Sequence, residues 1–428
     1  MRVVVYGLWH LGCVTAACLA RAGHQVAGLD PDARVIADLQ RGQPPLQEPG
    51  LAELLAAGLA SKHLSFHTEP AAALEQADIL WVTFDTPVNE QDEAEVAFVH
   101  TRLEEAASAL KPGTLVLISS QVPVGFTRAL QHDWSGKGLH FAYSPENLRL
   151  GKAIEAFCHP ERIILGVEAD SERQRLIELF APFCAHLEWM SLESAEMTKH
   201  ALNAFLATSV TFINELARLC EEVGADAKEV ERGLKSEGRI GPRAYLSPGA
   251  AFAGGTLARD LRFLVRRGQE VCVQTPMLQG VLSSNELHKN WVRERIHHLL
   301  TGIDHPVVAV LGLTYKPGTS TLRRSSSVEL CRFLHDLGVR VRGHDPAVYK
   351  LPPELNRVME LTNGPLDALN GAHLVVIATE WPSYRQLRPM DVHARMRTPC
   401  VIDPNHFLAD VLGDDPRIHY FATGKRAA

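Results

Sequence analysis

The first stretch of the chain, MRVVVYGLWHLGCVTAACLARAGHQVAGLD (Met1–Asp30), decides the fold. An apolar strand, a glycine turn, an alanine-rich helix and a second strand follow one another, which is the order of a dinucleotide-binding βαβ unit. Gly7 suits the tight turn, and Gly12 allows the helix to pack closely against it. Asp30 ends the second strand, where it can accept hydrogen bonds from the adenosine ribose. Its charge disfavours the additional phosphate of NADP, so the sequence predicts NAD.

Trp9 interrupts this pattern. Dinucleotide-binding turns carry a glycine at that position, where the backbone comes closest to the pyrophosphate. Either the indole turns away and the turn through Leu11 to Gly12 still holds phosphate at the helix N-terminus, or the indole fills part of the cofactor site. The sequence alone leaves both alternatives open, together with an ordinary βα turn that binds no ligand.

A second unit of the same kind is predicted near the other end of the chain. The segment HPVVAVLGLTYKPGTSTLRRSSSVELCRFLHDLGVRVRGHDPAV (305–348) again reads as strand, glycine turn, helix and strand. Between the two units, SLESAEMTKHALNAFLATSVTFINELARLCEEVGAD (191–226) has a long helical periodicity. The expected fold is therefore α/β, with two Rossmann-like, doubly wound parallel-sheet domains joined by a long-helix central domain. The predicted domains are 1–190, 191–299 and 300–428.

The composition is typical of a soluble globular protein. Of the 428 residues, 46% are hydrophobic and 22% are charged, and the net charge of -7 offers no basic surface for nucleic acid or anionic membrane. No apolar run is long enough to span a bilayer, and the N-terminus reads as strand and helix rather than a secretion signal. The eight cysteines have neither metal-binding nor disulfide spacing. We expect a cytoplasmic enzyme without a metal.

The loop AFAGGTLARD (251–260) resembles the active-site loop GFGGSCFPKD of the nucleotide-sugar 6-dehydrogenases, the UDP-glucose and GDP-mannose dehydrogenase family. The alignment places Thr256 on the catalytic cysteine of that family. Oxidation of a primary alcohol to a carboxylate takes two hydride transfers, and the family's thiolate adds to the intermediate aldehyde. Because an aliphatic hydroxyl stays protonated at neutral pH, Thr256 is poorly suited to that addition.

The same resemblance implies the other catalytic residues. SPENLR (144–149) is similar to the family's SPEFLREG, in which the glutamate and the residues after it bind the sugar; Leu150 replaces a second glutamate. Lys199 and Asn203 match the catalytic lysine and asparagine, and they share a helix face from which both can reach one oxyanion. Asp260 matches the carboxylate that pairs with the lysine through water. The implied catalytic set is Glu146, Lys199, Asn203, Thr256 and Asp260.

The resemblance also implies the residues that bind the two ligands. For the cofactor they are Gly7, Trp9, Leu11, Gly12, Asp30, Thr86, Ser120, Arg259 and Arg323. For the nucleotide sugar they are Glu146, Asn147, Leu148, Arg149, Lys199, Asn203, Arg239, Tyr245, Leu246, Phe252, Gly254, Tyr315 and Lys316. In the family, the arginine matched by Arg239 reaches the site of a neighbouring subunit, which implies a homodimer built on the helical segment.

Several substitutions leave more than one function open. The favoured reading is an NAD-dependent nucleotide-sugar oxidoreductase that carries out a two-electron oxidation. One alternative is an epimerase-type enzyme that oxidises and re-reduces its sugar on a retained NAD. Another is a catalytically silent binding protein, which would account for five departures from the family pattern together: Trp9, Gln121, Leu150, Thr256 and Asn405, the last standing where the family has an arginine.

Overall fold

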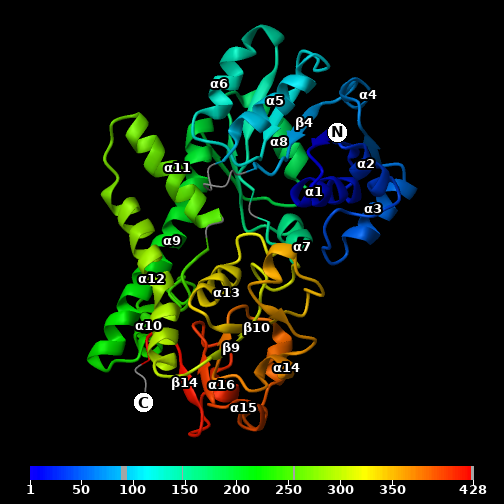
Figure 1. Cartoon of the computed structure of the whole chain (residues 1–428). Coiled ribbons are helices and arrows are strands. Elements are labelled where there is room, and N and C mark those ends of the chain that lie inside the picture. Colours follow the sequence, from blue (N-terminus) through cyan, green and yellow to red (C-terminus); the bar gives the residue numbers. More distant parts are fainter. Residues whose placement is uncertain (88–93, 147, 254–255, 426–428) are drawn as a thin grey trace. The chain divides into compact units, whose positions relative to one another are not determined.

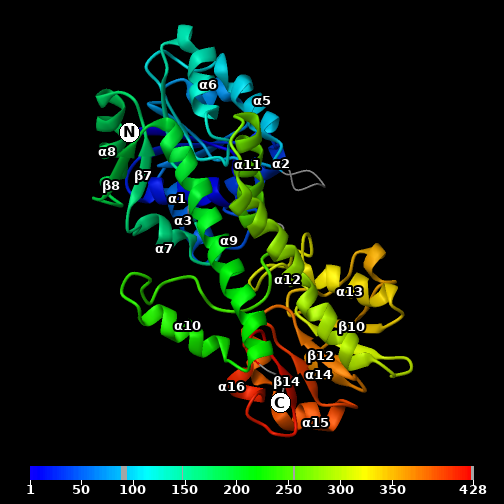
Figure 2. The ribbon, with the colours of Figure 1, turned by 90° about the vertical axis from the view of Figure 1, so that its left-hand side faces the viewer.

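A computed structural model describes residues 1–87, 94–146, 148–253 and 256–425. The chain forms two compact units, Met1–Leu202 and Asn203–Ala428, each built around one sheet (Figure 1). The boundary between them falls within the long helix α9 (Leu192–Val223), which Figure 2 shows along its length. The division into three domains at 190 and 299 stays a prediction.

The first unit has the strand order β3-β2-β1-β4-β5-β6-β7-β8. In such a sheet the order reverses between β1 and β4, and ligands bind beyond the carboxyl ends of the strands at this point. Neighbouring strands are parallel except β6 and β7, which form an antiparallel pair. The strands are β1 (Arg2–Tyr6), β2 (Gln25–Leu29), β3 (Leu64–His67), β4 (Ile79–Val82), β5 (Leu115–Ile118), β6 (His140–Tyr143), β7 (Ile163–Gly166) and β8 (Leu187–Met190).

Helices surround this sheet and connect its strands. Those before α9 are α1 (His10–Arg21), α2 (Ala33–Gln40), α3 (Leu51–Ala60), α4 (Pro70–Leu74), α5 (Val96–Ala107), α6 (Phe126–Asp133), α7 (Ala153–Cys158) and α8 (Asp170–Phe180).

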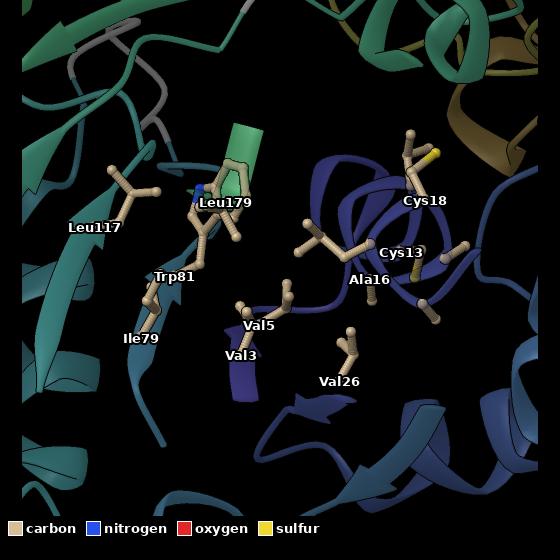
Figure 3. Packing of buried hydrophobic residues seen from close by; sticks show 14 of the residues in the cluster. Val3, Val5, Cys13, Ala16, Cys18, Val26, Ile79, Trp81, Leu117 and Leu179 are labelled. Carbon is tan, nitrogen blue, oxygen red and sulfur yellow. The ribbon is translucent and has the colours of Figure 1, made fainter. Parts of the chain in front are cut away.

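Alternation along the strands builds a core on each face of the sheet. Val3 and Val5 of β1 pack on one face, together with Trp81 of β4 and with α1 (Figure 3). Val4 and Tyr6 of β1 pack on the opposite face. Side chains of a strand point alternately to the two faces, and burying one large apolar side chain stabilises the fold by about 1.5–3 kcal/mol. The apolar strand predicted at the N-terminus is therefore buried on both faces, as is typical of a parallel sheet covered by helices.

The second unit contains a parallel sheet with the order β11-β10-β9-β12-β13-β14. Its strands are β9 (Val307–Leu311), β10 (Arg340–His344), β11 (Glu360–Leu361), β12 (Leu374–Ile377), β13 (Cys400–Ile402) and β14 (His419–Phe421). Its helices after α9 are α10 (Ala227–Ser236), α11 (Thr256–Glu270), α12 (Pro276–Leu300), α13 (Ser326–Asp336), α14 (Pro365–Leu369), α15 (Pro389–Arg395) and α16 (Ala409–Leu412). Two sheets, parallel throughout except for the β6–β7 pair, and a long central helix confirm the predicted fold class.

The acid that ends β10 repeats the position of Asp30 in the first unit but is sealed. Asp345 is 2% exposed, and its Oδ2 accepts hydrogen bonds from the backbone N–H groups of Leu313 and Thr314 at 2.8 and 2.9 Å. The same oxygen accepts from the Thr314 hydroxyl at 2.9 Å and from the Trp381 indole at 3.0 Å. Side chains of the protein thus occupy the space around this acid.

All eight cysteines are free thiols, and each is buried except Cys272. This confirms that most of them act as small apolar side chains. Within the described part of the chain, no helix has both the length and the apolar character needed to cross a bilayer.

Candidate active site

The turn between β1 and α1 has the geometry that its glycines suggested. Gly7 has a φ of +101°, in the region that favours glycine. A Cβ atom at Gly12 would lie 2.0 Å from the Gly7 carbonyl oxygen, so the helix start touches the turn directly. Thr83 donates its hydroxyl hydrogen to the same carbonyl at 2.8 Å, which fixes the turn against the end of β4. The turn therefore presents backbone N–H groups at the start of α1, as phosphate binding requires.

Asp30 is hydrogen-bonded to this turn, and Trp9 is part of it. The Asp30 Oδ2 atom accepts from the Leu8 N–H at 2.8 Å and Oδ1 accepts from the Asp32 N–H at 3.0 Å. A carboxylate has about four acceptor positions, so Asp30 has capacity for ribose hydroxyls. Trp9 is the residue before α1, and its side chain is 46% exposed. The indole therefore lies at the surface of the unit rather than in the apolar core.

Two residues beyond the ends of β4 and β5 face the same sheet edge. The Thr86 hydroxyl donates to the Gln121 carbonyl at 2.6 Å. Ser120 is 1% exposed, and among the described residues its buried Oγ atom finds no hydrogen-bond partner. A buried hydroxyl without a partner costs free energy, and a ribose hydroxyl would satisfy it. The turn, Asp30 and Ser120 together fit a dinucleotide such as NAD.

Lys199 and Glu146 are brought together within the first unit. Lys199 is 9% exposed, donates to the main-chain carbonyl of Glu146, and lies 3.8 Å from its Oε2 atom. The Glu146 carboxylate also accepts from the Leu148 N–H. Because a buried ammonium group is costly without partners, these contacts offset the cost of burying the lysine side chain. Arg149 is exposed, and Asn147 lies outside the described residues.

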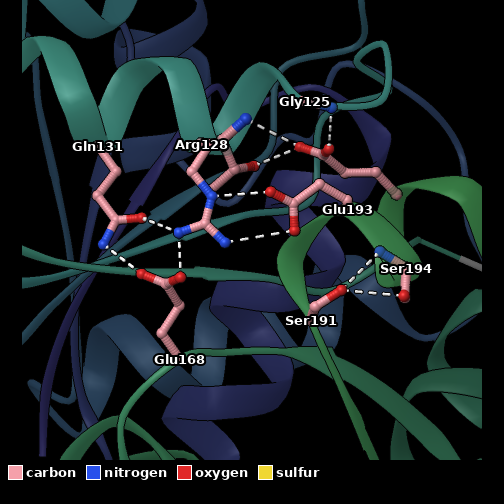
Figure 4. A network of polar contacts seen from close by, with 9 residues as sticks. Gly125, Arg128, Gln131, Glu168, Ser191, Glu193 and Ser194 are labelled. Atoms are coloured by element: carbon pink, nitrogen blue, oxygen red, sulfur yellow. Dashed lines mark hydrogen bonds and ion pairs between the residues drawn. The ribbon is translucent and has the colours of Figure 1, made fainter.

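The start of α9, which carries Lys199, is anchored by a polar network. Arg128 pairs with Glu193 at 2.7 Å and with Glu168, to which Gln131 also donates at 2.7 Å (Figure 4). One helical turn before Lys199, Glu196 is fully buried.

Glu196 accepts from the N–H and the hydroxyl of Thr127 at 2.9 and 2.6 Å, and also from the Gly125 N–H. Burial raises the pKa of Glu196, although these donors oppose the change. The network fixes the position of Lys199 through its own helix.

Asn203 and Asp260 form a buried, hydrogen-bonded pair in the second unit. Asp260 is fully buried and Asn203 is 5% exposed, and the Asn203 amide donates to Asp260 Oδ2. Thr256 is the first residue of α11 and is exposed. A helix N-terminus lowers the pKa of a thiol, but the pKa of an aliphatic hydroxyl lies too far above neutral pH for the hydroxyl to ionise there.

The loop before Thr256 is held by side chains that the sequence did not single out. Asn214 of α9 accepts from the Gly249 N–H at 3.0 Å, and His288 of α12 contacts the Gly249 carbonyl at 2.8 Å. Asn285 of α12 accepts from the Phe252 N–H at 3.0 Å and donates to its carbonyl at 2.9 Å. The signal in the sequence that could have identified these side chains is a polar residue among apolar neighbours within a predicted helix.

Asn405, at the position where the family resemblance implied an arginine, also holds this loop. Its Oδ1 atom accepts from the Ala250 N–H at 2.7 Å. An arginine at this position would present a guanidinium cation to a diphosphate, whereas Asn405 accepts a hydrogen bond from the backbone of the loop.

The remaining predicted ligand residues of the second unit are mostly exposed. Arg239 pairs with its neighbour Glu237 at 3.0 Å, and its side chain is 89% exposed. Tyr245 is 59% exposed, whereas Leu246 is buried. Burial raises the pKa of Tyr315, and the nearby charges of Arg259 and Arg324 oppose this change. Lys316 and Arg323 are exposed, and Gly254 lies outside the described residues.

No group of three or more metal-binding side chains occurs within the described ranges.

Three family models cover most of the chain. They are described as the NAD binding domain, the central domain and the UDP binding domain of the UDP-glucose/GDP-mannose dehydrogenase family, and they match residues 1–184, 193–287 and 309–410. The chain is 34% identical to a UDP-glucose 6-dehydrogenase of Pseudomonas aeruginosa over 427 residues, covering 96% of this chain and 94% of the relative. It is 33% identical to that of Rhizobium meliloti over 414 residues, covering 94% of each.

Solved structures show the same fold. The UDP-glucose dehydrogenase of Pyrobaculum islandicum superposes with a TM-score of 0.88 at 29% identity, covering 99% of this chain and 98% of the other. A UDP-D-ManNAc dehydrogenase from Pyrococcus horikoshii is similar in fold, with a TM-score of 0.87 at 21% identity and 99% of each chain covered.

Proposed function

Because this chain belongs to the UDP-glucose/GDP-mannose dehydrogenase family, we propose that it oxidises a CH–OH group of a nucleotide sugar by one hydride transfer per turnover. The observation that carries the proposal is the buried Lys199, which donates to the Glu146 carbonyl and lies 3.8 Å from its carboxylate. A site without chemistry has no use for an ammonium group that is costly to bury.

The proposed chemistry divides into a hydride and a proton. NAD, held by the β1–α1 turn, Asp30 and Ser120, would supply the acceptor for the hydride of the carbinol carbon. Lys199 and Asn203 then stabilise the negative charge that develops on the oxygen as the hydroxyl proton leaves. An amide nitrogen carries two donors, and Asp260 takes one of them. Asp260 and Glu146 are the proposed proton acceptors, acting directly or through water.

Thr256 limits the reaction to the first oxidation. The product after one hydride transfer is an aldehyde or ketone, and the further oxidation of an aldehyde to an acid requires a nucleophile or an activated water. Thr256 stands exposed at the start of α11 with a hydroxyl that stays protonated. The expected product is therefore an aldehyde or keto sugar, either released or reduced again on the same cofactor.

Counting NADH formed per sugar consumed tests this proposal. With UDP-glucose as the first candidate substrate, we expect one NADH per sugar consumed if the product is released, and almost no net NADH if the product is reduced again. Mass spectrometry of the product is expected to show no uronic acid. Two NADH and a uronic acid would show that the loop completes the oxidation without a cysteine. Thr256→Cys is the informative variant, since a restored thiol is expected to move the ratio towards two.

We also propose that the chain acts as a homodimer. Three apolar residues of α9 recur at intervals of seven and are exposed: Phe205 at 71%, Phe212 at 46% and Leu219 at 59%. Such a stripe along one helix face is typical of a covered surface. In the proposed dimer, the exposed Arg239 reaches the nucleotide-sugar site of the partner.

The cytoplasm is the proposed location. Free cysteines, buried and unpaired with one another by disulfides, are typical of a reducing compartment.

A further inference from the structure

Glu48 is a buried carboxylate that the proposed reaction does not use. It lies in the loop between α2 and α3, and its side chain is 1% exposed. Removing a charge from water costs several kcal/mol unless hydrogen bonds and opposite charge replace the water. Its partners therefore indicate its role.

Three donors surround this carboxylate. His10 Nε2 lies 2.9 Å from Glu48 Oε2, the Gly151 N–H donates to the same oxygen at 2.7 Å, and the Ala153 N–H donates to Oε1 at 2.8 Å. Burial by itself raises the pKa of Glu48, but the contacts with Gly151, His10 and Ala153 outweigh it and leave the pKa below its usual value. Glu48 is thus ionised at neutral pH, and its hydrogen bonds are of the strong, charge-assisted kind.

These donors come from two segments with different proposed ligands. His10 is the first residue of α1, and it follows Trp9 directly in the turn proposed to hold the NAD pyrophosphate. Gly151 and Ala153 lie two and four residues beyond the 146–149 segment, which is proposed to bind the sugar. All of these groups belong to the first unit. One carboxylate is therefore attached to both ligand-binding segments.

A purely local role accounts for part of this arrangement. A carboxylate at the start of α7 satisfies N–H groups that have no partner in the helix. That role explains the bonds from Gly151 and Ala153, but it does not explain the bond to His10 on a different helix. Nor does it explain why the acid comes from a loop about a hundred residues away in sequence, at separations of 103 and 105 residues.

We propose that Glu48 is a positioning residue that couples the dinucleotide turn to the 146–153 segment, so that NAD and nucleotide sugar each raise the affinity for the other. The proposal rests on the proposed function. A shift of the turn on NAD binding moves His10, and Glu48 passes this shift to the backbone at Gly151 and Ala153. Because such coupling is reciprocal, either ligand can be used to measure it.

Calorimetric titration of the full-length protein tests the coupling. The dissociation constant of the dinucleotide is measured without and with saturating UDP-glucose, for the wild type, Glu48→Gln and the control Glu53→Gln. NADH takes the place of NAD in these titrations, so that UDP-glucose is not oxidised while binding is measured. Glu53 is exposed in the first turn of α3, so its variant loses the same charge without these contacts. We expect UDP-glucose to tighten dinucleotide binding by at least ~5-fold in the wild type and in Glu53→Gln, and by less than ~2-fold in Glu48→Gln.

Each result decides the matter. If Glu48→Gln weakens dinucleotide binding with and without UDP-glucose by the same factor, the role is structural and the coupling is overturned. A wild-type ratio near one overturns it as well. A wild type that binds neither ligand rejects the proposed function first, and the coupling with it. Should Glu48→Gln fail to fold, His10→Ala leaves both backbone bonds in place and is expected to lose the same ratio.

Discussion

Replacing Gly12 by alanine separates the two elements that form the dinucleotide turn. The added Cβ would lie 2.0 Å from the Gly7 carbonyl oxygen, whereas real Cβ atoms essentially never come closer than 3.0 Å, so the contact must open by at least 1.0 Å. The Thr83 hydroxyl lies 2.8 Å from the same Cβ position and hydrogen-bonds that carbonyl. Backbone and buried hydroxyl surround the methyl group, so α1 itself must move.

The expected cost follows from this geometry. Overpacking of a well-packed interior destabilises by about 1–3 kcal/mol. One kcal/mol lowers the melting temperature of a domain of this size by roughly 2–4 °C, so we expect a decrease of roughly 2–12 °C. A shifted helix start also misdirects its N–H groups from the pyrophosphate. A loss of about 1.4 kcal/mol in binding is tenfold in affinity, and NAD is expected to bind at least ~10-fold more weakly.

Thermal melting and calorimetric titration with NAD measure both effects. Gly136→Ala is the matched control, because a Cβ there meets nothing within 4 Å. It is expected to leave the melting temperature and the NAD affinity unchanged. If Gly12→Ala melts lower but binds NAD normally, the turn does not hold the cofactor. If neither quantity changes, the close contact between Gly7 and Gly12 is wrong.

Three further predictions concern catalysis, pH and assembly. Lys199→Ala is expected to lower kcat by about 100-fold with little change in KM, since its charge acts in the transition state; near-normal turnover would reduce Lys199 to a packing residue. Burial raises the pKa of Glu231, but contacts with two lysines of α10 and with Ser247 hold it at about 2, below the usual 4.5. This depressed pKa stabilises the fold above pH 4.5, and the contribution is lost as the pH falls towards 2. Glu231→Gln should therefore lower the free energy of unfolding by at most roughly 3 kcal/mol at neutral pH. It should also weaken the decrease of the melting temperature between pH 4.5 and 2, and an unchanged decrease would contradict the assignment. Phe212→Glu is expected to give monomers by light scattering, whereas Ile177→Glu, exposed on α8, should not; a dimeric Phe212→Glu would place the interface elsewhere.

The sequence predicted best what local chemistry controls. The turn at Gly7 and the close contact at Gly12 follow from glycine positions between a strand and a helix, since few other residues tolerate that geometry. The helix carrying Lys199 and Asn203 follows from apolar periodicity. The antiparallel pairing of β6 and β7 did not follow, because short apolar strands read alike in either direction.

Long-range contacts within the site were not predictable from sequence patterns. Asn405 binds Ala250 across 155 residues of sequence. Glu48 precedes a proline and a glycine, which predicts only a turn. The roles of such residues depend on which segments the fold places side by side, and one sequence carries no direct record of that.

The two acids that end β2 and β10 show how a repeated architecture can come to serve different ends. Each oxygen of Asp30 accepts one backbone N–H, and a carboxylate has further acceptor positions. Around Asp345, a threonine hydroxyl and an indole occupy such positions. In the second unit, side chains of the protein thus make the hydrogen bonds that a ligand could make to Asp30 in the first unit. A ligand that bound at Asp345 would have to displace Trp381 and break its hydrogen bond to this carboxylate. Ligand binding at Asp345 is therefore disfavoured, whereas Asp30 in the first unit keeps acceptor positions for a ligand.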